Sequence, residues 1–221
     1  MENKGSNNNL LVPKWKNRTH DTHIKHLNEY QGGKYPIVFL GDSMMERWLT
    51  TGKSHWKNTF SKCANLGVGG DGVEHLLYRL TTGSDTVRTD EFKGILDVIT
   101  TDLILLMIGT NNLEKNSPDE ILEGIINIIR IILEKTSSGS FISSKLIVFG
   151  LPDRTDRPKE TISELNLKLK GYINDMNNPR VSYSFFGDYV NYDDKFFDDS
   201  VHLSYLGYDV WYDHLKELLK L

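Results

Sequence analysis

Short apolar runs recur along the chain, and amphipathic segments lie between them. The residues "PIVFL" (36–40), "DLILLMIG" (102–109) and "KLIVFG" (145–150) are almost wholly apolar and end at or beside a glycine. The segments "KCANLGV" (62–68) and "RVSYSFF" (180–186) are weaker candidates of the same kind. Apolar runs without polar alternation are typical of strands that are covered on both faces. The pattern therefore predicts five buried strands.

The segments between these runs carry apolar residues at helical spacing. Such residues occur over 73–80, 121–132, 162–169 and 211–219. Ser117 and Pro118 stand where a helix N-cap and a first helical residue are expected. Strands that alternate with helices indicate βαβ units, and hence a parallel sheet with right-handed crossovers.

Length and composition favour one domain. The 221 residues are 38% hydrophobic, which suits a single α/β domain at 13–221, and the polar, Asn-rich residues 1–12 are predicted to be a disordered tail. The net charge of −4 and the lack of a long basic run argue against nucleic acid as a partner. One cysteine, no secretory signal and no apolar run of membrane-spanning length lead us to expect a cytoplasmic protein.

The stretch "NLGVGGDGVEH" (65–75) raises the possibility of a nucleotide site. Gly67, Gly69 and Gly72 fit the dinucleotide-binding fingerprint, but the segment before them is only weakly apolar. The residues "TGKS" (51–54) resemble the end of a P-loop, yet Arg47 occupies the position of its first glycine. Nucleotide binding is therefore the weaker interpretation.

Four segments with complementary chemistry are expected at one edge of the sheet. They are "GDSM" (41–44), "GVGGDG" (67–72), "GTNN" (109–112) and, before the last helix, "DDSVH" (198–202). Ser43 offers a hydroxyl at a tight turn, His202 offers a base, and Asp199 is close enough to orient the imidazole. These three residues can act as nucleophile, base and orienter.

The same segments contain donors for a developing oxyanion. Gly70 can present a backbone N–H with no side chain in the way, and Asn111 can present its amide. With the N–H of Ser43 they make three donors. The glycines are thus expected to bring a donor to a reacting carbonyl. Asp42 is predicted to fix the turn, and Asn112 to support its loop.

The four blocks, in this order, resemble the SGNH (GDSL-type) hydrolase superfamily, from about Tyr35 to the C-terminus. Within this superfamily, the residues of the four blocks are most similar to those of the type I platelet-activating-factor acetylhydrolase α subunits. The resemblance implies Ser43 as nucleophile, Asp199 and His202 as the rest of a triad, and the three oxyanion donors named above. It also implies possible dimerisation. The fold class that we predict is α/β: a flavodoxin-like three-layer α/β/α sandwich with a five-stranded parallel sheet in the order 2-1-3-4-5.

The predicted function is hydrolysis of a small-molecule acyl ester through an acyl-enzyme on Ser43, with no metal ion or organic cofactor. Met44, Thr110 and Val201 flank the reacting groups in sequence and are expected to leave room for a short acyl group only. A thioesterase or a carbohydrate O-deacetylase would use the same groups. A non-catalytic scaffold or binding protein is the alternative from another class.

Three histidines at a spacing of three, His20, His23 and His26, could suggest a metal site. The residues between them are largely polar, and no cysteine or H-E-x-x-H motif accompanies them. A solvated helix is the expectation for this segment.

Overall fold

A five-stranded parallel sheet forms the centre of the computed structural model, which describes residues 8–81, 93–137, 144–190 and 194–221. The strands are β1 (Lys34–Gly41), β2 (Ala64–Gly67), β3 (Thr100–Met107), β4 (Lys145–Phe149) and β5 (Val181–Ser184). Every neighbouring pair is parallel, in the order β2-β1-β3-β4-β5. The five predicted strands and their predicted order are confirmed.

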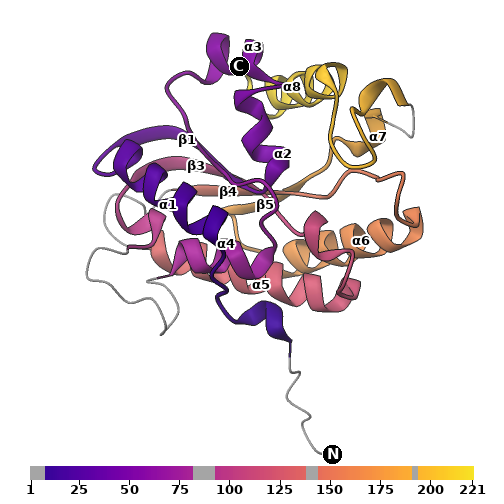
Figure 1. Ribbon diagram of the computed structural model, residues 1–221, viewed down its shortest axis with the longest axis horizontal. Coiled ribbons are helices and arrows are strands. Elements are labelled where there is room, and N and C mark those ends of the chain that lie inside the picture. The colour runs from indigo at the N-terminus through magenta and orange to yellow at the C-terminus, as the bar shows by residue number, and fades with distance from the viewer. Residues whose placement is uncertain (1–7, 82–92, 138–143, 191–193) are drawn as a thin grey trace, which may run out of the picture.

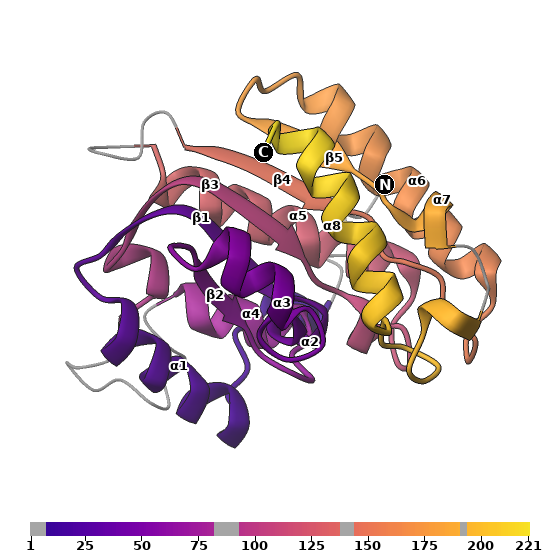
Figure 2. The ribbon, with the colours of Figure 1, turned by 90° about the horizontal axis from the view of Figure 1, so that it is seen from above.

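Helices cover both faces of this sheet. They are α1 (Asn17–Tyr30), α2 (Ser43–Glu46), α3 (Lys53–His55), α4 (Val73–Leu80), α5 (Pro118–Lys135), α6 (Lys159–Met176), α7 (Gly187–Val190) and α8 (Tyr205–Leu219). Figure 1 shows α2, α3 and α8 above the strands and α4, α5 and α6 below them. In the view from above, α8 passes over the β4–β5 side of the sheet (Figure 2). The three-layer α/β/α sandwich is thus confirmed.

Shorter helical turns complete the described chain. The 3₁₀ turns are η1 (Asn9–Leu11), η2 (Arg47–Leu49), η4 (Ile95–Asp97), η5 (Thr110–Asn112) and η7 (Asp194–Phe196), and η3 (Trp56–Phe60) is a π-helical turn. Of these, η5 carries the Asn111 block.

The start of α5 follows the predicted capping chemistry. The Ser117 hydroxyl accepts a hydrogen bond from the Glu120 N–H, and the Glu120 carboxylate accepts one from the Ser117 N–H. This capping box satisfies two N–H groups that the first helical turn leaves unpaired. The predicted apolar stripe then faces the sheet, with Ile121, Ile125, Ile128, Ile129 and Ile132 all buried.

Aromatic packing fixes α8 against the rest of the upper layer. Trp211 stacks on Phe186 with ring centroids 4.6 Å apart, and Trp48 packs edge-on against Tyr208 at 5.1 Å. The Tyr208 hydroxyl donates a hydrogen bond to the Met44 carbonyl at 2.6 Å. These contacts hold the start of α8, and the segment before it, next to α2.

The boundary of the predicted N-terminal tail is wrong at its inner end. Residues 1–7 lie outside the described residues, but η1 is folded and Leu10 is only 4% exposed. The Asn8 amide donates to the Glu120 carbonyl at 2.8 Å, and the Leu10 side chain packs beside Gly124 of α5. One leucine among polar residues gave too weak a pattern to predict this contact.

The expectation of a solvated helix for α1 is also wrong in part. His23 is fully buried and His26 is 8% exposed. Burial lowers the pKa of His23 to about 4 and that of His26 to about 3, so both rings are neutral at pH 7. One His23 ring nitrogen lies 2.8 Å from the Lys93 carbonyl. These two rings pack inside the fold rather than facing solvent.

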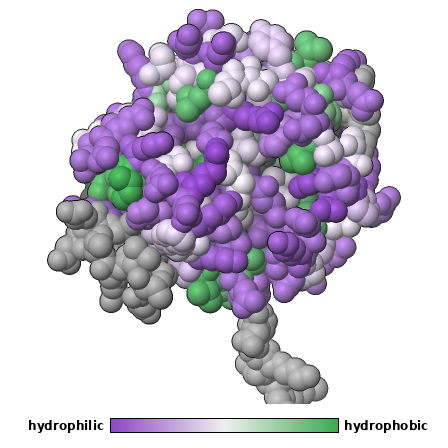
Figure 3. All heavy atoms as spheres, in the orientation of Figure 1, coloured by the Kyte–Doolittle hydropathy of each residue, from purple (hydrophilic) through white to green (hydrophobic). Residues whose placement is uncertain are grey.

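The face shown in Figure 3 is predominantly polar. On the face shown in Figure 3, apolar side chains form small separate patches among hydrophilic ones. Among the described helices, none combines the length and apolar character that crossing a membrane requires.

Leu10→Ala tests whether the N-terminal segment belongs to the core. We expect it to lower the free energy of unfolding by about 2–4 kcal/mol, because it removes buried apolar atoms and leaves a cavity. Val12→Ala is the matched control: Val12 is 61% exposed, and its loss should cost less than about 0.5 kcal/mol. Equal effects in urea denaturation would show that η1 does not contribute to stability.

Candidate active site

The sheet register brings three of the predicted blocks side by side. Gly41, the last residue of β1, pairs with Gly67 at the end of β2 and with Met107 at the end of β3. Parallel strands place their carboxyl ends at one edge, so the loops that follow these residues emerge together. The predicted site therefore lies where three adjacent strands end.

A short turn presents Ser43. Asp42 is the N-cap of α2, and its carboxylate accepts a hydrogen bond from the Met44 N–H at 2.9 Å. The Asp42 carbonyl accepts from the N–H groups of Met45 and Glu46. Ser43 is thereby the first residue of α2. Asp42 fixes the turn, as the sequence predicts.

Ser43, His202 and Asp199 form a continuous hydrogen-bonded chain. The Ser43 hydroxyl lies 2.9 Å from Nε2 of His202, and Nδ1 of His202 lies 2.8 Å from Oδ2 of Asp199. The other oxygen, Asp199 Oδ1, accepts from the N–H groups of Val201 and His202. Neighbouring Asp198 instead approaches Arg47 at 3.6 Å. Asp199, and not Asp198, is therefore the carboxylate that bonds to His202.

The hydrogen bonds also set the charge of Asp199. Partial burial would raise its pKa, but the bonds from the His202 side chain and from two backbone N–H groups outweigh it and lower the pKa to about 2. An ionised Asp199 accepts a hydrogen bond from the Nδ1–H group of His202. Nε2 is then left as the acceptor for the Ser43 hydroxyl.

The glycine block forms a loop that packs against α2. A Cβ on Gly67 would lie 2.1 Å from the Glu46 backbone nitrogen, so no side chain fits there. Gly70 has φ +78°, a conformation that strains other residues. Within the described residues, the N–H groups of Gly70 and Ser43 have no hydrogen-bond acceptor. Both are free to donate to a ligand.

The two asparagines of η5 have different partners. The Asn111 amide donates to the Asp71 carbonyl at 2.8 Å, which places it beside the residue that follows Gly70 and leaves its second N–H available. Asn112 accepts from the Val73 N–H and donates to Glu74. Asn112 therefore ties its loop to the start of α4.

A fully buried arginine, which no sequence pattern singles out, connects these segments. Arg79 pairs with the Asp71 carboxylate at 2.8 Å and donates to the carbonyls of Leu66 and Gly41 at 2.8 and 2.9 Å. Asp71 also accepts from the Thr19 hydroxyl of α1. In a helix, one charged residue usually faces solvent, so only the fold reveals this role.

The loop after β4 contacts two parts of the site. Arg154, which is 8% exposed, donates to the Thr110 carbonyl at 2.7 Å and is paired with Asp156. The next residue, Thr155, donates its N–H to the Ser200 carbonyl. This loop therefore links the Asn111 block to the His202 block.

The three residues predicted to border the acyl group are placed differently. Met44 is 1% exposed and packs in the core, Thr110 is buried beside Arg154, and Val201 is partly exposed. Their role as walls of an acyl pocket stays a prediction.

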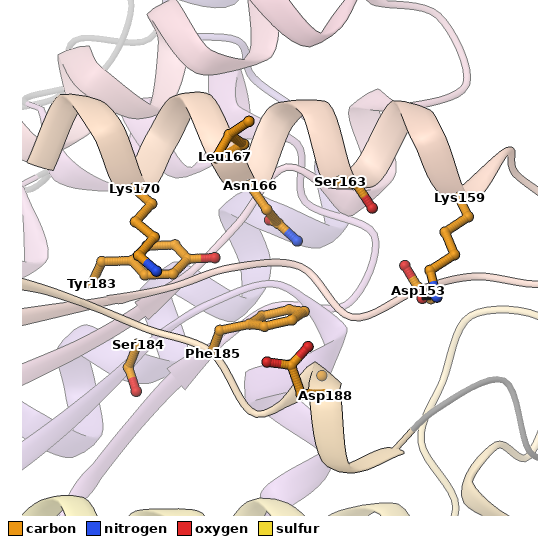
Figure 4. A pocket seen from close by; sticks show the side chains of 11 residues that line it. Asp153, Lys159, Ser163, Asn166, Leu167, Lys170, Tyr183, Ser184, Phe185 and Asp188 are labelled. Atoms are coloured by element: carbon orange, nitrogen blue, oxygen red, sulfur yellow. Dashed lines mark ion pairs between the residues drawn. The ribbon is translucent and has the colours of Figure 1, made fainter.

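A separate cavity of about 500 Å³ lies between α6 and β5 (Figure 4). The rings of Tyr183 and Phe185 and the ion pair of Asp153 with Lys159 line it. No residue of the hydrogen-bonded chain contributes to it. In the described part of the chain, no cluster of three or more His, Cys, Asp or Glu could hold a metal ion.

The comparisons with known proteins identify the family and the fold. The GDSL-like lipase/acylhydrolase family matches residues 39–210, and the chain belongs to that family. A Bacteroides fragilis protein assigned to the acylhydrolases superposes with a TM-score of 0.69, at 17% identity, over 94% of this chain and 98% of that one. A carbohydrate esterase of family 3 from Talaromyces cellulolyticus gives 0.58, at 15% identity, over 84% and 96%. At such identities these likenesses establish the fold.

Among curated proteins, the chain is similar to platelet-activating factor acetylhydrolase IB subunits. It is 31% identical to the human alpha2 subunit over 139 residues, which are 61% of this chain and 52% of the relative. It is 25% identical to the Drosophila melanogaster subunit beta homolog over 159 residues, which are 71% and 62%. The chain thus spans about half the length of the first of these relatives.

Asp42 makes stability depend on pH. Burial raises its pKa from 3.8 to about 7, although the bond from Met44 opposes the shift, and its second oxygen has no hydrogen-bond partner among the described residues. Between about pH 4 and 7 the folded chain holds a proton that the unfolded chain releases. The free energy of unfolding is therefore highest, as far as Asp42 is concerned, below about pH 4. It falls as the pH rises from about 4 to about 7.

Asp42→Asn should remove this dependence, because an amide cannot ionise. We expect the variant to gain on the order of 2–4 kcal/mol relative to wild type between pH 4 and pH 8, as read from urea denaturation. Asp102→Asn, at an exposed position of β3, controls for the loss of one carboxyl. A wild-type-to-variant difference that is constant over this range would show that Asp42 does not titrate there.

Proposed function

We propose that the protein is a serine esterase that hydrolyses short-chain acyl esters through an acyl-enzyme on Ser43. The observation that carries the proposal is the chain of hydrogen bonds from Ser43 through His202 to Asp199. It lies at the carboxyl ends of the strands, where this class of fold binds its ligands.

Acylation begins when the Ser43 hydroxyl attacks the ester carbonyl. His202 takes the hydroxyl proton on Nε2, which now accepts from that hydroxyl at 2.9 Å. Asp199 keeps the Nδ1 proton in place and stabilises the imidazolium. As the carbonyl–alkoxy bond breaks, His202 returns the proton to the leaving alcohol, and the acyl group remains on Ser43.

Deacylation repeats these steps with water. His202 removes a proton from water while the oxygen attacks the acyl carbon. The Ser43–acyl bond then breaks, and His202 gives the proton back to Ser43. The carboxylic acid leaves and the starting state is restored.

The negative oxygen of both tetrahedral intermediates needs hydrogen-bond donors. The free N–H groups of Ser43 and Gly70 and the second amide N–H of Asn111 are assigned this role. Two observations support this assignment: the N–H groups of Ser43 and Gly70 have no acceptor among the described residues, and the Asn111 amide is bonded to Asp71, the residue after Gly70. Fixed donors of this kind stabilise the transition state without reorganising.

The acyl group is proposed to be short, with acetyl as the first candidate. The similar proteins support this choice, because they include acetylhydrolases among the curated proteins and an acetyl esterase among the solved structures. The structural likeness to a carbohydrate esterase keeps a carbohydrate O-deacetylase as the second candidate. Both share the same acyl chemistry and differ in the alcohol.

Ser43→Ala tests the nucleophile. We expect it to abolish labelling by a fluorophosphonate and to lower kcat for p-nitrophenyl acetate by on the order of 10⁴-fold, with an unchanged Tm. Ser61→Ala, on an exposed loop, should remain active and be labelled at Ser43. If Ser43→Ala kept more than about a tenth of the activity, another group would have to be the nucleophile.

The chain-length profile tests the acyl preference. We expect kcat/KM for p-nitrophenyl esters to be highest from acetyl to butyryl and to fall by decanoyl, because overpacking a closed pocket costs about 1–3 kcal/mol. Met44→Ala should move the optimum to longer chains. A wild-type profile still rising at decanoyl would contradict a closed pocket.

A further inference from the structure

Lys16 and Arg18, at the start of α1, are hydrogen-bonded to the glycine loop directly or through Glu46. Both residues precede the part of the chain that matches the family, which begins at residue 39. The Lys16 ammonium donates to the Gly70 carbonyl at 2.9 Å. The Arg18 guanidinium bonds both oxygens of Glu46, at 2.9 and 3.0 Å. Glu46 in turn accepts from the Gly69 N–H at 3.1 Å.

Hydrogen bonds hold the two peptides on either side of the Gly69–Gly70 peptide. The Gly69 N–H is held by Glu46, the Asp71 N–H donates to the Val68 carbonyl, and the Gly70 carbonyl is held by Lys16. The Gly70 N–H lies between these points and has no acceptor among the described residues. Its direction is therefore set by the groups on either side.

The charges also suit a negative oxygen. On the Gly69–Gly70 side, Lys16 and Arg18 carry two positive charges and Glu46 one negative charge, while the Glu74 carboxylate lies against Gly72 at the far end of the loop, where Asn112 donates to it. A Cβ on Gly70 would lie 3.1 Å from the Lys16 ammonium, so the cation sits directly against this residue.

We propose that Lys16 is a positioning residue of the oxyanion site, which aims the Gly70 N–H and adds positive potential where the tetrahedral oxygen forms. Arg18 and Glu46 hold the loop at Gly69, and we call Lys16, Arg18 and Glu46 together the clamp. This inference rests on the proposed function, because it needs an oxyanion at Gly70.

The clamp contributes to geometry rather than to global stability. The Arg18 and Glu46 side chains are 57% and 29% exposed, and ion pairs of this kind contribute little to folding. A change in kcat without a change in Tm therefore separates positioning from a structural role.

Lys16→Met is the central variant. We expect kcat for p-nitrophenyl acetate to fall by about tenfold, less than for the loss of a direct donor, while KM stays within about twofold. The affinity for a boronic acid, which adds to Ser43 as a tetrahedral anion, should fall by a similar factor. Lys16→Arg, which keeps charge and donor, should recover most of both.

Lys25→Met is the matched control, because Lys25 is exposed on the same helix. It should match the wild type in kcat, in boronic acid affinity and in Tm. Arg18→Met tests the clamp at Gly69 and also serves if Lys16→Met does not fold. We expect it to lower kcat by about threefold at constant KM.

Wild-type kcat in both Lys16→Met and Arg18→Met would overturn the clamp, and so would a loss confined to KM. If Lys16→Met does not fold, wild-type kcat in Arg18→Met alone overturns it. The proposed function fails on a different result, namely esterase activity that survives Ser43→Ala.

Discussion

The site depends on one buried guanidinium. Arg79 reaches the carbonyl of Gly41 at the end of β1, the carbonyl of Leu66 in β2, and the carboxylate of Asp71 in the glycine loop. A buried arginine is costly unless all its donors are satisfied, and here the ring of acceptors comes from three segments at once. Their relative positions are therefore fixed together, including the turn that carries Ser43.

The remaining part of the site comes from the opposite end of the chain. His202 and Asp199 lie before α8, which is held to α2 by aromatic packing and by the hydrogen bond from Tyr208 to Met44. The loop after β4 contacts both sides through Arg154 and Thr155. The arrangement is thus supported from below by Arg79 and from above by α8.

The sequence was sufficient where the signal was local and repeated. Three apolar runs and two weaker segments were enough to predict the five strands, and the motif blocks were enough to predict that Ser43, Asp199 and His202 would meet. It was insufficient where a single residue acts at long range. Arg79, Leu10 and His23 are buried by contacts with distant segments, and nothing in their neighbours' pattern distinguishes them from solvent-facing residues. Tertiary packing decides such positions.

The central claim is that Ser43 carries the acyl group during turnover. The most direct measurement is acid quenching of the enzyme during hydrolysis of p-nitrophenyl acetate, followed by peptide mapping by mass spectrometry. The account predicts an acetyl group on the peptide that contains Ser43, at a stoichiometry that rises to a steady level and disappears when substrate is exhausted. An active enzyme that carries its acetyl group on another residue, or that turns over with none, would contradict it.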